Sequence, residues 1–293
     1  MRTAKRAPLA SVAVIGGSGL YDMPGLIGKR LVRANTPFGR PSGPILLGSL
    51  SGVPCAFIAR HGPGHVLTPS EINQRANIFA LKALGVEKIV AVAAVGSLRE
   101  ELVPRHFVFP DQLVDETKGR PSTFFGDGVV AHVAFDAPFC YEQSQLLYEA
   151  SRETGITSHF GGVYVCMEGP AFSTRAESEY HRQMGYSVIG MTASPEARLA
   201  REAEICYSLV ALVTDYDCWK AGEEVSTEKV VENLLANVSN AQKLLERSVL
   251  AVASRPRRCR CASALAGAIF TNPKAMNRKT LKKLKPLIGR HVS

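Results

Sequence analysis

The segment SVAVIGGSG (residues 11–19) joins a short run rich in β-branched residues to a glycine-rich turn. The run predicts a buried strand, and the glycines allow backbone N–H groups to approach an anion. Apolar runs that end in small or polar residues, instead of a hairpin turn, precede four other loops: Arg60-His61-Gly62, Val95-Gly96-Ser97, Thr192 and Thr214–Asp217. Because ligands gather at the carboxyl ends of strands in α/β sheets, the five loops predict a shared small-molecule pocket.

Short β runs alternate with helical stretches along the chain, which predicts an α/β fold. Strands are expected at Ser11–Ile15, Ile45–Leu50, Val53–Ala59, Lys88–Ala94, His106–Phe109, Gly161–Cys166, Val188–Met191 and Ser208–Val213. Helices are expected at Pro69–Leu84, Glu142–Thr154, Thr174–Met184, Pro195–Glu204 and Ser226–Ala253, with a short basic helix from Pro273 to Leu284 that Pro286 ends. Thr174 and Glu177 have the spacing of a capping box, which favours a helix that begins there.

Composition restricts the class of protein. The 293 residues are 46% apolar and 21% charged, with a mean hydropathy of +0.02, so a large core is possible and disorder is excluded for most of the chain. No window approaches the roughly 18–20 apolar residues of a membrane-spanning helix. The charged N-terminus leads into a short β run and not into the apolar segment of a signal peptide, so we expect a cytoplasmic protein.

The positive charge is concentrated at one end. The chain carries a formal net charge of +9, but residues 254–293 hold eleven Lys and Arg and no Asp or Glu, which leaves the remainder at −2. We therefore divide the chain into an N-terminal extension (residues 1–10), a main domain (11–253) and a basic C-terminal tail (254–293). The tail could meet nucleic acid, an acidic neighbouring subunit or water, and we expect solvent or a subunit rather than nucleic acid.

The seven cysteines are scattered, odd in number and without a CxxC motif. This pattern indicates neither a secreted disulfide framework nor a zinc site, and no metal site is predicted. Several cysteines lie in apolar runs, where Cys behaves as a small hydrophobic residue. The pair Cys259 and Cys261 stands in a basic stretch that is expected to be exposed and to lower a thiol pKa.

Two loops carry side chains suited to phosphate. The loop at Gly16–Gly19 lacks the third glycine of a dinucleotide fingerprint and the Lys-Ser/Thr ending of a P-loop. Taken alone it is a turn after a strand, in which Ser18 adds a hydroxyl. Arg60 and His61, which could equally be a surface pair, would supply a guanidinium fork and an imidazole. The two loops together favour phosphate binding.

Asp215 and Asp217 follow a predicted strand two residues apart. They could form a solvated acidic turn. Alternatively, both carboxyl groups could face one planar heterocycle, where one accepts from an exocyclic amine and the other, protonated, donates to a ring nitrogen. Donation to a leaving base is general acid catalysis, and partial burial would raise the pKa of the carboxyl group as that role requires.

An ordered series of motifs between Val12 and Ala253 resembles the nucleoside phosphorylase superfamily, in particular its trimeric members that cleave 5′-methylthioadenosine. The motifs are Ile15–Leu20, Thr36–Gly39, Ala59–Gly62, Asn73–Asn77, Gly96–Glu101, Glu168–Glu177, Gly190–Thr192, Pro195-Glu196 and Thr214–Trp219. The resemblance implies a single domain with a central mixed β-sheet flanked by helices. It also implies reversible phosphorolysis of 5′-methylthioadenosine to adenine and 5-methylthioribose 1-phosphate, with inorganic phosphate as co-substrate and neither metal nor organic cofactor.

The resemblance also assigns site residues. The positions matching the phosphate site are Ser18, Arg60, His61 and Thr192, with backbone from Ala93 and Ala94. Ala93 departs from several relatives, which carry Thr there, so one hydroxyl is lost. Met191 matches the ribose contact and Phe172 the ring that stacks on the base. In the base-binding loop Thr214–Asp217, Asp215 resembles the acid at N7 and Asp217 the partner of the amino group.

The resemblance further implies an assembly. His132 resembles a residue that an adjacent subunit lends to cover the 5′-methylthio group, and Thr227, Val230 and Val231 would line the same apolar pocket. We therefore expect a homotrimer or a dimer of trimers with sites at subunit interfaces. Some relatives carry a similar Cys-x-Cys pair that forms a disulfide, and here Cys259 and Cys261 could be a disulfide or two free thiols.

Two alternatives stay open. A purine nucleoside phosphorylase could act on 6-oxopurine nucleosides or on adenosine, but relatives specific for 6-oxopurines place Asn where Asp215 stands, because an amide can donate to the oxo group. A regulatory protein without catalytic activity could bind nucleic acid through the basic tail, but the phosphate and base motifs argue against it.

Overall fold

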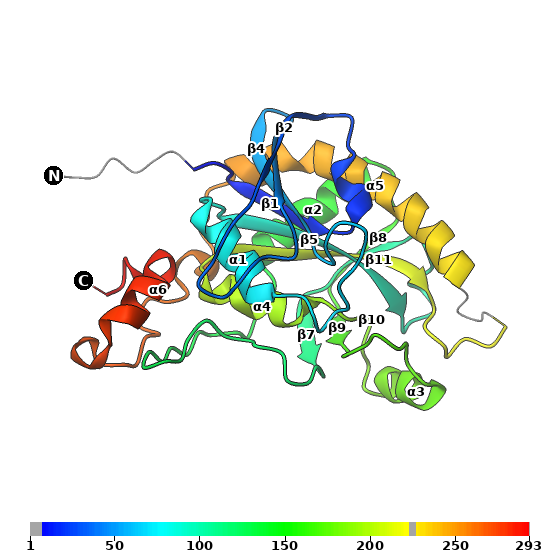
Figure 1. Ribbon diagram of the computed structural model, residues 1–293. Helices are drawn as coiled ribbons and strands as arrows, with labels where there is room; N and C mark the ends of the chain where they lie inside the picture. The colour runs from blue at the N-terminus through cyan, green and yellow to red at the C-terminus, as the bar shows by residue number, and fades with distance from the viewer. Residues whose placement is uncertain (1–7, 223–226, 293) are drawn as a thin grey trace.

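The computed structural model describes residues 8–222 and 227–292, with a mixed β-sheet at its centre and helices on both faces (Figure 1). The expected α/β architecture is therefore confirmed. The strands of the sheet are β1 (Val12–Gly16), β2 (Leu26–Val32), β3 (Ile45–Leu50), β4 (Val53–Ala59), β5 (Lys88–Ser97), β6 (Phe107–Phe109), β7 (Gln112–Asp115), β8 (Ser158–Phe160), β9 (Val163–Cys166), β10 (Val188–Gly190) and β11 (Cys206–Asp215).

Four parallel strands, in the order β4, β1, β5 and β11, form the middle of the sheet. Their register places Gly16 beside Ala59 and Asp215 beside Gly96. Strands β3 and β2 extend the sheet antiparallel beyond β4. At its carboxyl end β5 also pairs with β10, which runs antiparallel to it. The four parallel strands thus bring their carboxyl ends to one edge, where the loops that follow them can share a site.

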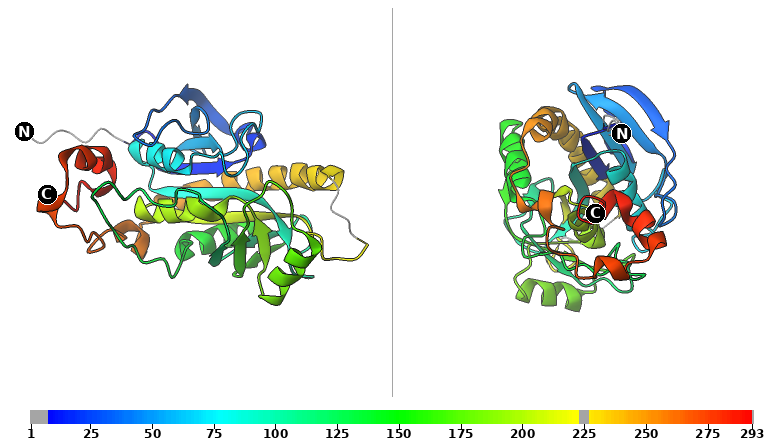
Figure 2. Two further views of the ribbon diagram at one scale, coloured as in Figure 1. Left: turned by 60° about the horizontal axis from the view of Figure 1, so that its bottom comes forward. Right: turned by 90° about the vertical axis from the view of Figure 1, so that its left-hand side faces the viewer.

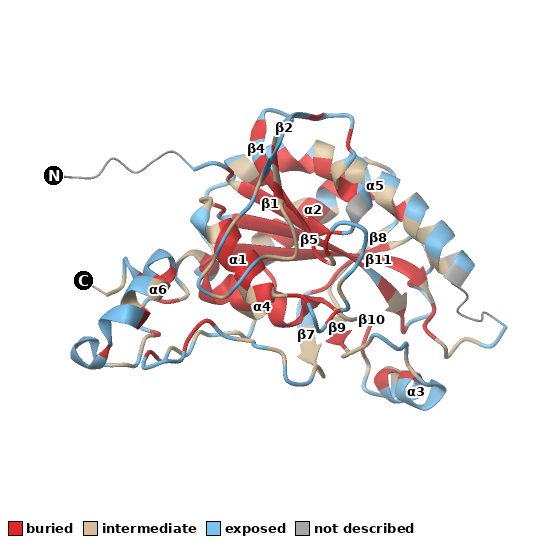
Figure 3. Ribbon diagram, in the orientation of Figure 1, coloured by how far each residue is buried: buried red, intermediate tan, exposed pale blue. Residues whose placement is uncertain are grey.

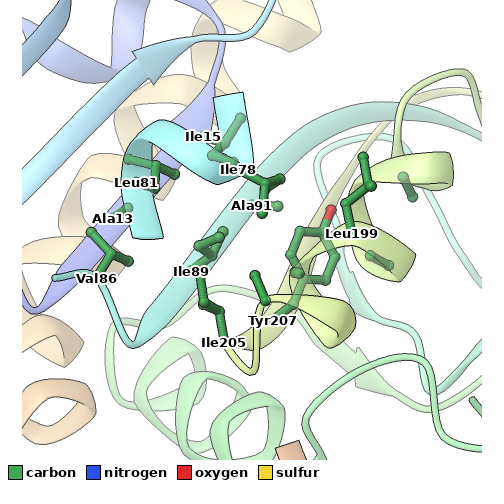
Figure 4. Packing of buried hydrophobic residues seen from close by; sticks show 14 of the residues in the cluster. Ala13, Ile15, Ile78, Leu81, Val86, Ile89, Ala91, Leu199, Ile205 and Tyr207 are labelled. Atoms are coloured by element: carbon green, nitrogen blue, oxygen red, sulfur yellow. The ribbon is translucent and has the colours of Figure 1, made fainter. Parts of the chain in front are cut away.

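Alternate side chains of the central strands fill two separate cores. In β5, Ile89, Ala91 and Ala93 belong to the core covered by α1 (Gln74–Ala83) and α4 (Ala193–Glu202). Val90 and Val92 belong to the core covered by α2 (Tyr141–Glu153) and α5 (Thr227–Ser254). Figure 4 shows the first core, and the buried strands lie between the helices in Figure 3. The apolar runs of these strands are explained by burial on both faces.

All eight predicted strands are present, and three further strands, β2, β7 and β8, were not predicted. Strand β2 lies at an edge of the sheet, and most of its residues are exposed and include Lys29 and Arg30, so it lacks an apolar run. Strands β7 and β8 contain only four and three residues. Such short strands are defined by their neighbours in the sheet and leave little pattern in the sequence.

The predicted helices are present, with shifted ends. Helix α3 (Arg175–Gln183) begins at the predicted capping box, since Thr174 and Glu177 cap each other. Helix α1 begins at Gln74 after the cap Asn73, five residues later than expected. The expectation that Pro286 ends the last helix was wrong, because α6 (Arg278–Ile288) contains it. Leu287 and Ile288 are buried in the core, and this packing offsets the hydrogen bond that proline cannot donate.

The basic tail folds against the main domain of its own chain, which was not predicted from the sequence. Contact of the tail with another subunit stays a prediction. It contains the short helices η2 (Arg260–Ser263) and η3 (Pro273–Ala275) before α6, which packs beside α1 (Figure 2). Four of its basic side chains form ion pairs with acids of the domain: Arg257 with Glu87, Arg260 with Asp136, Lys283 with Asp127, and Arg290 with Glu204. In the described parts of the chain, no helix is long and apolar enough to cross a membrane.

Candidate active site

The centre of the candidate site is the carboxyl half of β5. Every residue of this strand is buried except Ala94, which is exposed, and Gly96, which is half-buried. An exposed alanine inside a buried strand marks a place where the surface above the sheet is open. Ala94 lies beside Leu212, and Gly96 lies beside Asp215. The predicted phosphate backbone at Ala94 and the predicted base-binding loop therefore lie on neighbouring strands.

Arg60 lies directly after β4, with a guanidinium group that is almost completely buried. Its Nε and Nη2 donate to the two carboxylate oxygens of Glu196, each at 3.0 Å. Nη1 donates to the carbonyl of Val92 at 2.8 Å, and Nη2 also donates to that of Ile15 at 3.3 Å. These bonds fix Arg60 to the carboxyl end of β1 and to the middle of β5. Of its five N–H groups, one on Nη1 is left for a ligand.

His61 adjoins Arg60, and its tautomer follows from its hydrogen bond. The Nδ1–H donates to the carbonyl of Leu67 at 2.9 Å, and the ring stacks on His65 with centroids 4.2 Å apart. Burial, with the nearby charge of Arg60, lowers the pKa of His61 to about 4. The imidazole is therefore neutral at pH 7, and its Nε2 presents a lone pair.

Met191 and Thr192 follow β10, which runs antiparallel to β5. Because β10 is antiparallel to β5, with Ile189 beside Gly96, the chain that leaves β10 returns alongside the carboxyl half of β5. Thr192 is the N-cap residue of α4, but its hydroxyl makes no capping hydrogen bond. The backbone is non-helical at Ser194, so the regular helix that carries Glu196 begins past this kink, and the N–H of Thr192 donates to the hydroxyl of Tyr164 at 3.5 Å.

The carboxyl groups of Asp215 and Asp217 have different environments. Asp215 accepts from the hydroxyl of Thr214 at 2.7 Å and from the N–H of Asp217 at 2.8 Å. Burial nevertheless raises the pKa of Asp215, and the charge of Asp217 acts in the same direction. In Asp217, Oδ2 is buried and has no hydrogen-bond partner among the described residues. One carboxyl group thus favours protonation, and the other presents an unused acceptor.

Gly96 allows the two aspartates to approach β5. A Cβ atom at this position would lie 3.1 Å from Oδ1 of Asp215 and 3.3 Å from Cβ of Asp217. Both distances are tighter than ordinary contacts, so a larger residue would displace the base-binding loop Thr214–Asp217, the acidic loop of the site.

A profile of the phosphorylase superfamily matches residues 11–250, which covers the sheet and all the loops above. The chain belongs to the phosphorylase superfamily.

Similar members of the superfamily have names that specify a substrate. The chain is 52% identical to S-methyl-5′-thioadenosine phosphorylases of Koribacter versatilis and Geobacter sulfurreducens, over 96% of its own length and 97% and 99% of theirs. It resembles a crystal structure of a methylthioadenosine phosphorylase from an Antarctic soil metagenomic library, with a TM-score of 0.93 and 50% identity. The match covers 96% of this chain and 99% of the other. It also resembles a Schistosoma mansoni adenosine/methylthioadenosine phosphorylase variant in complex with methylthioadenosine, with a TM-score of 0.80 and 36% identity. That match covers 88% of this chain and 96% of the other.

The other described residues of this phosphorylase-superfamily chain that are predicted to contact the substrate are more exposed to solvent than Arg60 and Asp217. Phe172 is 64% exposed, Val231 is exposed and Val230 is half-buried. Ser18 begins η1 (Ser18–Tyr21) and Thr227 begins α5, but the side chains of both lie outside the described part of the structure.

His132 lies apart from the acidic loop of its own chain. It belongs to the extended segment after β7, which runs towards α6 in Figure 1. Its backbone N–H donates to Ala268, and its ring contacts Phe270 edge-on. It lines a cavity of about 460 Å³ together with Arg198 and Glu202. These contacts join His132 to the tail, so a role in the methylthio pocket requires a neighbouring subunit and stays a prediction.

Two residues that position the site, Glu196 and Arg120, were not predicted as site residues. Glu196 is fully buried and accepts from Tyr207 at 2.8 Å as well as from Arg60. Arg120 donates to the carbonyls of Met191 at 2.7 Å and Ser194 at 3.2 Å, which holds the turn before α4. A charged residue within the apolar side of a predicted helix signals a buried pair, so Glu196 had a detectable signal. Arg120 lies in an irregular segment and had none.

Proposed function

We propose that the chain catalyses the reversible phosphorolysis of 5′-methylthioadenosine, in which phosphate attacks C1′ and releases adenine and 5-methylthioribose 1-phosphate. The pair of unlike aspartates on the loop after β11 carries the proposal, because adenine needs an acceptor for its amino group and a donor at N7. The names of relatives about 50% identical over nearly the whole chain support the same substrate.

The phosphate end of the site supplies position and charge. In this proposal the remaining N–H of Arg60, the free hydroxyl of Thr192 and the backbone at Ala93 and Ala94 bind one anion. An anion held below C1′ is both the nucleophile and the counter-charge for an oxocarbenium-like transition state. Ser18 and His61 complete this set in the proposal.

The base end of the site supplies a proton. Because burial raises the pKa of Asp215, a larger fraction of its carboxyl group is protonated near neutral pH than in water. The proton passes to N7 as the bond from C1′ to the base breaks, and adenine leaves as a neutral molecule. Oδ2 of Asp217 accepts from the exocyclic amine, which removes an unsatisfied buried acceptor.

The sugar end of the site is completed by assembly in this proposal. Met191 contacts the ribose, Phe172 covers the base, and Val230 and Val231 face the methylthio group. His132 of a neighbouring subunit closes the pocket, which requires a homotrimer or a dimer of trimers. We place the enzyme in the cytoplasm, with phosphate as its co-substrate and no cofactor, and we expect no role for nucleic acid.

One comparison of substrates tests the proposal. Adenine release from 5′-methylthioadenosine should depend on phosphate and should exceed base release from inosine by at least about thirtyfold in kcat/KM, since two mismatched polar groups cost roughly 1–3 kcal/mol each. Equal or higher activity on inosine would favour the alternative, a purine nucleoside phosphorylase for 6-oxopurines. Adenosine in the same assay measures the contribution of the methylthio pocket.

A further inference from the structure

Four cysteines that are far apart in the sequence meet at one place in the structure. The Sγ atoms of Cys140, Cys206, Cys259 and Cys261 all lie within 4.8 Å of one another. Three of these residues are buried and Cys259 is half-buried. The pair Cys259 and Cys261 is thus not the exposed thiol pair that its basic neighbourhood predicts.

Two of these cysteines, Cys140 and Cys206, belong to the main domain. Cys140 is the N-cap residue of α2, and its N–H donates to the carbonyl of Tyr207 at 2.7 Å. Cys206 is the first residue of β11, and its N–H donates to the carbonyl of Glu87 at 3.0 Å. Their two thiols therefore have fixed positions on adjacent elements of the domain.

The tail brings the other two thiols. Cys259 precedes η2 and Cys261 lies within it. On the N-terminal side of the pair, Arg257 donates to the carbonyl of Glu204 and pairs with Glu87 at 2.8 Å. On the other side, the N–H of Leu265 donates to Glu204 at 3.1 Å. The short Cys-x-Cys segment is thereby fastened at both ends with its thiols turned towards Cys140 and Cys206.

The spacing of the four sulfurs suits a tetrahedral ion. Zinc bound by four thiolates has Zn–S bonds near 2.3 Å, which places the sulfurs about 3.8 Å apart. The Sγ atoms of Cys206 and Cys259 are 3.4 Å apart, which is well beyond the disulfide bond length of about 2.05 Å. We propose that Cys140, Cys206, Cys259 and Cys261 bind one structural Zn²⁺ ion that fastens the tail to the domain.

The surroundings offset the charge of such a site. Binding converts four thiols and Zn²⁺ into a Zn(S)₄ centre of charge −2 and releases four protons. Lys88 lines a small cavity together with Cys140, Cys206 and Cys259. The positive charge of Arg201 interacts favourably with a thiolate at Cys261. Cys140 also lies at the positive end of α2. Four protein ligands leave no open coordination position, so the ion takes no part in phosphorolysis.

Metal content tests the proposal directly. The full chain is purified without a metal-affinity step, under reducing conditions, and its zinc content is measured by plasma mass spectrometry. About one zinc per chain is expected. In the double variant Cys259→Ser/Cys261→Ser it should fall at least about tenfold, whereas Cys55→Ala, which removes a buried thiol outside the cluster, should keep the full amount.

A second measurement on the unmodified chain protects the test against misfolding of the variant. Reduced, metal-free protein is titrated with Co²⁺, and an intense thiolate-to-cobalt charge-transfer band that saturates at one equivalent is expected. In the chain purified without reductant, two disulfides, detected as a mass lower by about four hydrogens and three titratable thiols of seven in denaturant, would overturn the proposal. Seven free thiols with neither zinc nor a cobalt band would overturn it equally.

Discussion

Arg60 and Glu196 form a two-pronged ion pair between the loop after β4 and helix α4, with both N···O distances 3.0 Å. Their side chains are only 3% and 0% exposed. A buried pair of this kind is costly to break, because the remaining partner would be an uncompensated charge. Glu196 therefore holds the guanidinium against the carbonyl of Val92, two residues before the exposed Ala94, where the proposal locates phosphate.

Arg60→Ala should raise the KM for phosphate and lower kcat. The variant loses one charge-assisted hydrogen bond to the nucleophile, worth about 1.5–3 kcal/mol, so kcat/KM for phosphate should fall roughly ten- to hundredfold. Arg60→Lys should recover part of this loss, and Arg247→Ala, which breaks an exposed ion pair with Glu153, should not change it. The KM for phosphate and kcat are measured for each variant by varying the phosphate concentration. Circular dichroism first shows that each variant is folded. An unchanged phosphate KM would remove Arg60 from the site.

Phosphate should raise the pKa of His61. In the free chain, burial lowers this pKa to about 4, so the ring is neutral at pH 7. A phosphate anion near Nε2 favours the protonated ring, because an opposite charge stabilises the imidazolium. NMR titration of the histidine signals with and without phosphate measures the shift, and His61→Asn identifies the signal. A His61 pKa that stays near 4 in saturating phosphate would place the anion elsewhere.

The main features of the fold could be predicted because they leave local patterns. The run at residues 12–16 and its glycine turn, the capping box at Thr174, and the two aspartates after β11 were all predicted from local sequence. The pairing of Arg60 with Glu196 could not be predicted from local sequence, because 136 residues separate the partners. The thiol cluster was missed for the same reason, since only two of its four members form a motif.

Glu202→Gln should stabilise the chain above neutral pH. Burial raises the pKa of Glu202 from its ordinary 4.5 to about 7, although Thr123 and Phe124 donate to it. The folded chain holds this proton between pH 4.5 and 7 while the unfolded chain releases it, so the free energy of unfolding falls as pH rises through that range. Above pH 7 the free energy of unfolding is lower than at pH 4.5 by at most about 3 kcal/mol from this group.

Urea unfolding of both proteins between pH 4.5 and 8.5 measures this difference. The stability of Glu202→Gln relative to the parent should increase up to about pH 7 and then stay constant. Glu153→Gln, at an exposed ion pair, should follow the parent. A difference that does not depend on pH would mean that Glu202 titrates normally.

His132 and Asp215 should complement each other between chains. In the proposed assembly each site takes Asp215 from one subunit and His132 from its neighbour. His132→Ala should therefore raise the KM for methylthioadenosine, and Asp215→Ala should remove acid catalysis. Co-expression of the two variants should restore low-KM activity in on the order of a quarter of sites, by random assortment in a cyclic assembly. A monomer with full activity in sedimentation at assay concentration would exclude the shared site.

Asp215→Asn should shift preference from 6-aminopurines towards 6-oxopurines. A protonated carboxyl group can give its proton to N7 of adenine, and burial favours that proton. An amide cannot deliver a proton, but it can donate to O6 of an oxopurine, which leaves more readily with that support. Each mismatched buried group costs roughly 1–3 kcal/mol, so the ratio of kcat/KM for methylthioadenosine and methylthioinosine should change about ten- to hundredfold.

Asp217 should limit this change of preference, because its unpaired Oδ2 still favours an amino group. The double variant Asp215→Asn/Asp217→Asn should therefore shift the ratio further than Asp215→Asn alone. Asp136→Asn, which removes an exposed carboxylate far along the chain from the acidic loop, should keep the parental ratio. The measurement is kcat/KM for both nucleosides in all four proteins. If the ratio in the single and double variants equals that of the parent, the loop after β11 does not recognise the base, and the assignment of Asp215 as the acid at N7 is wrong.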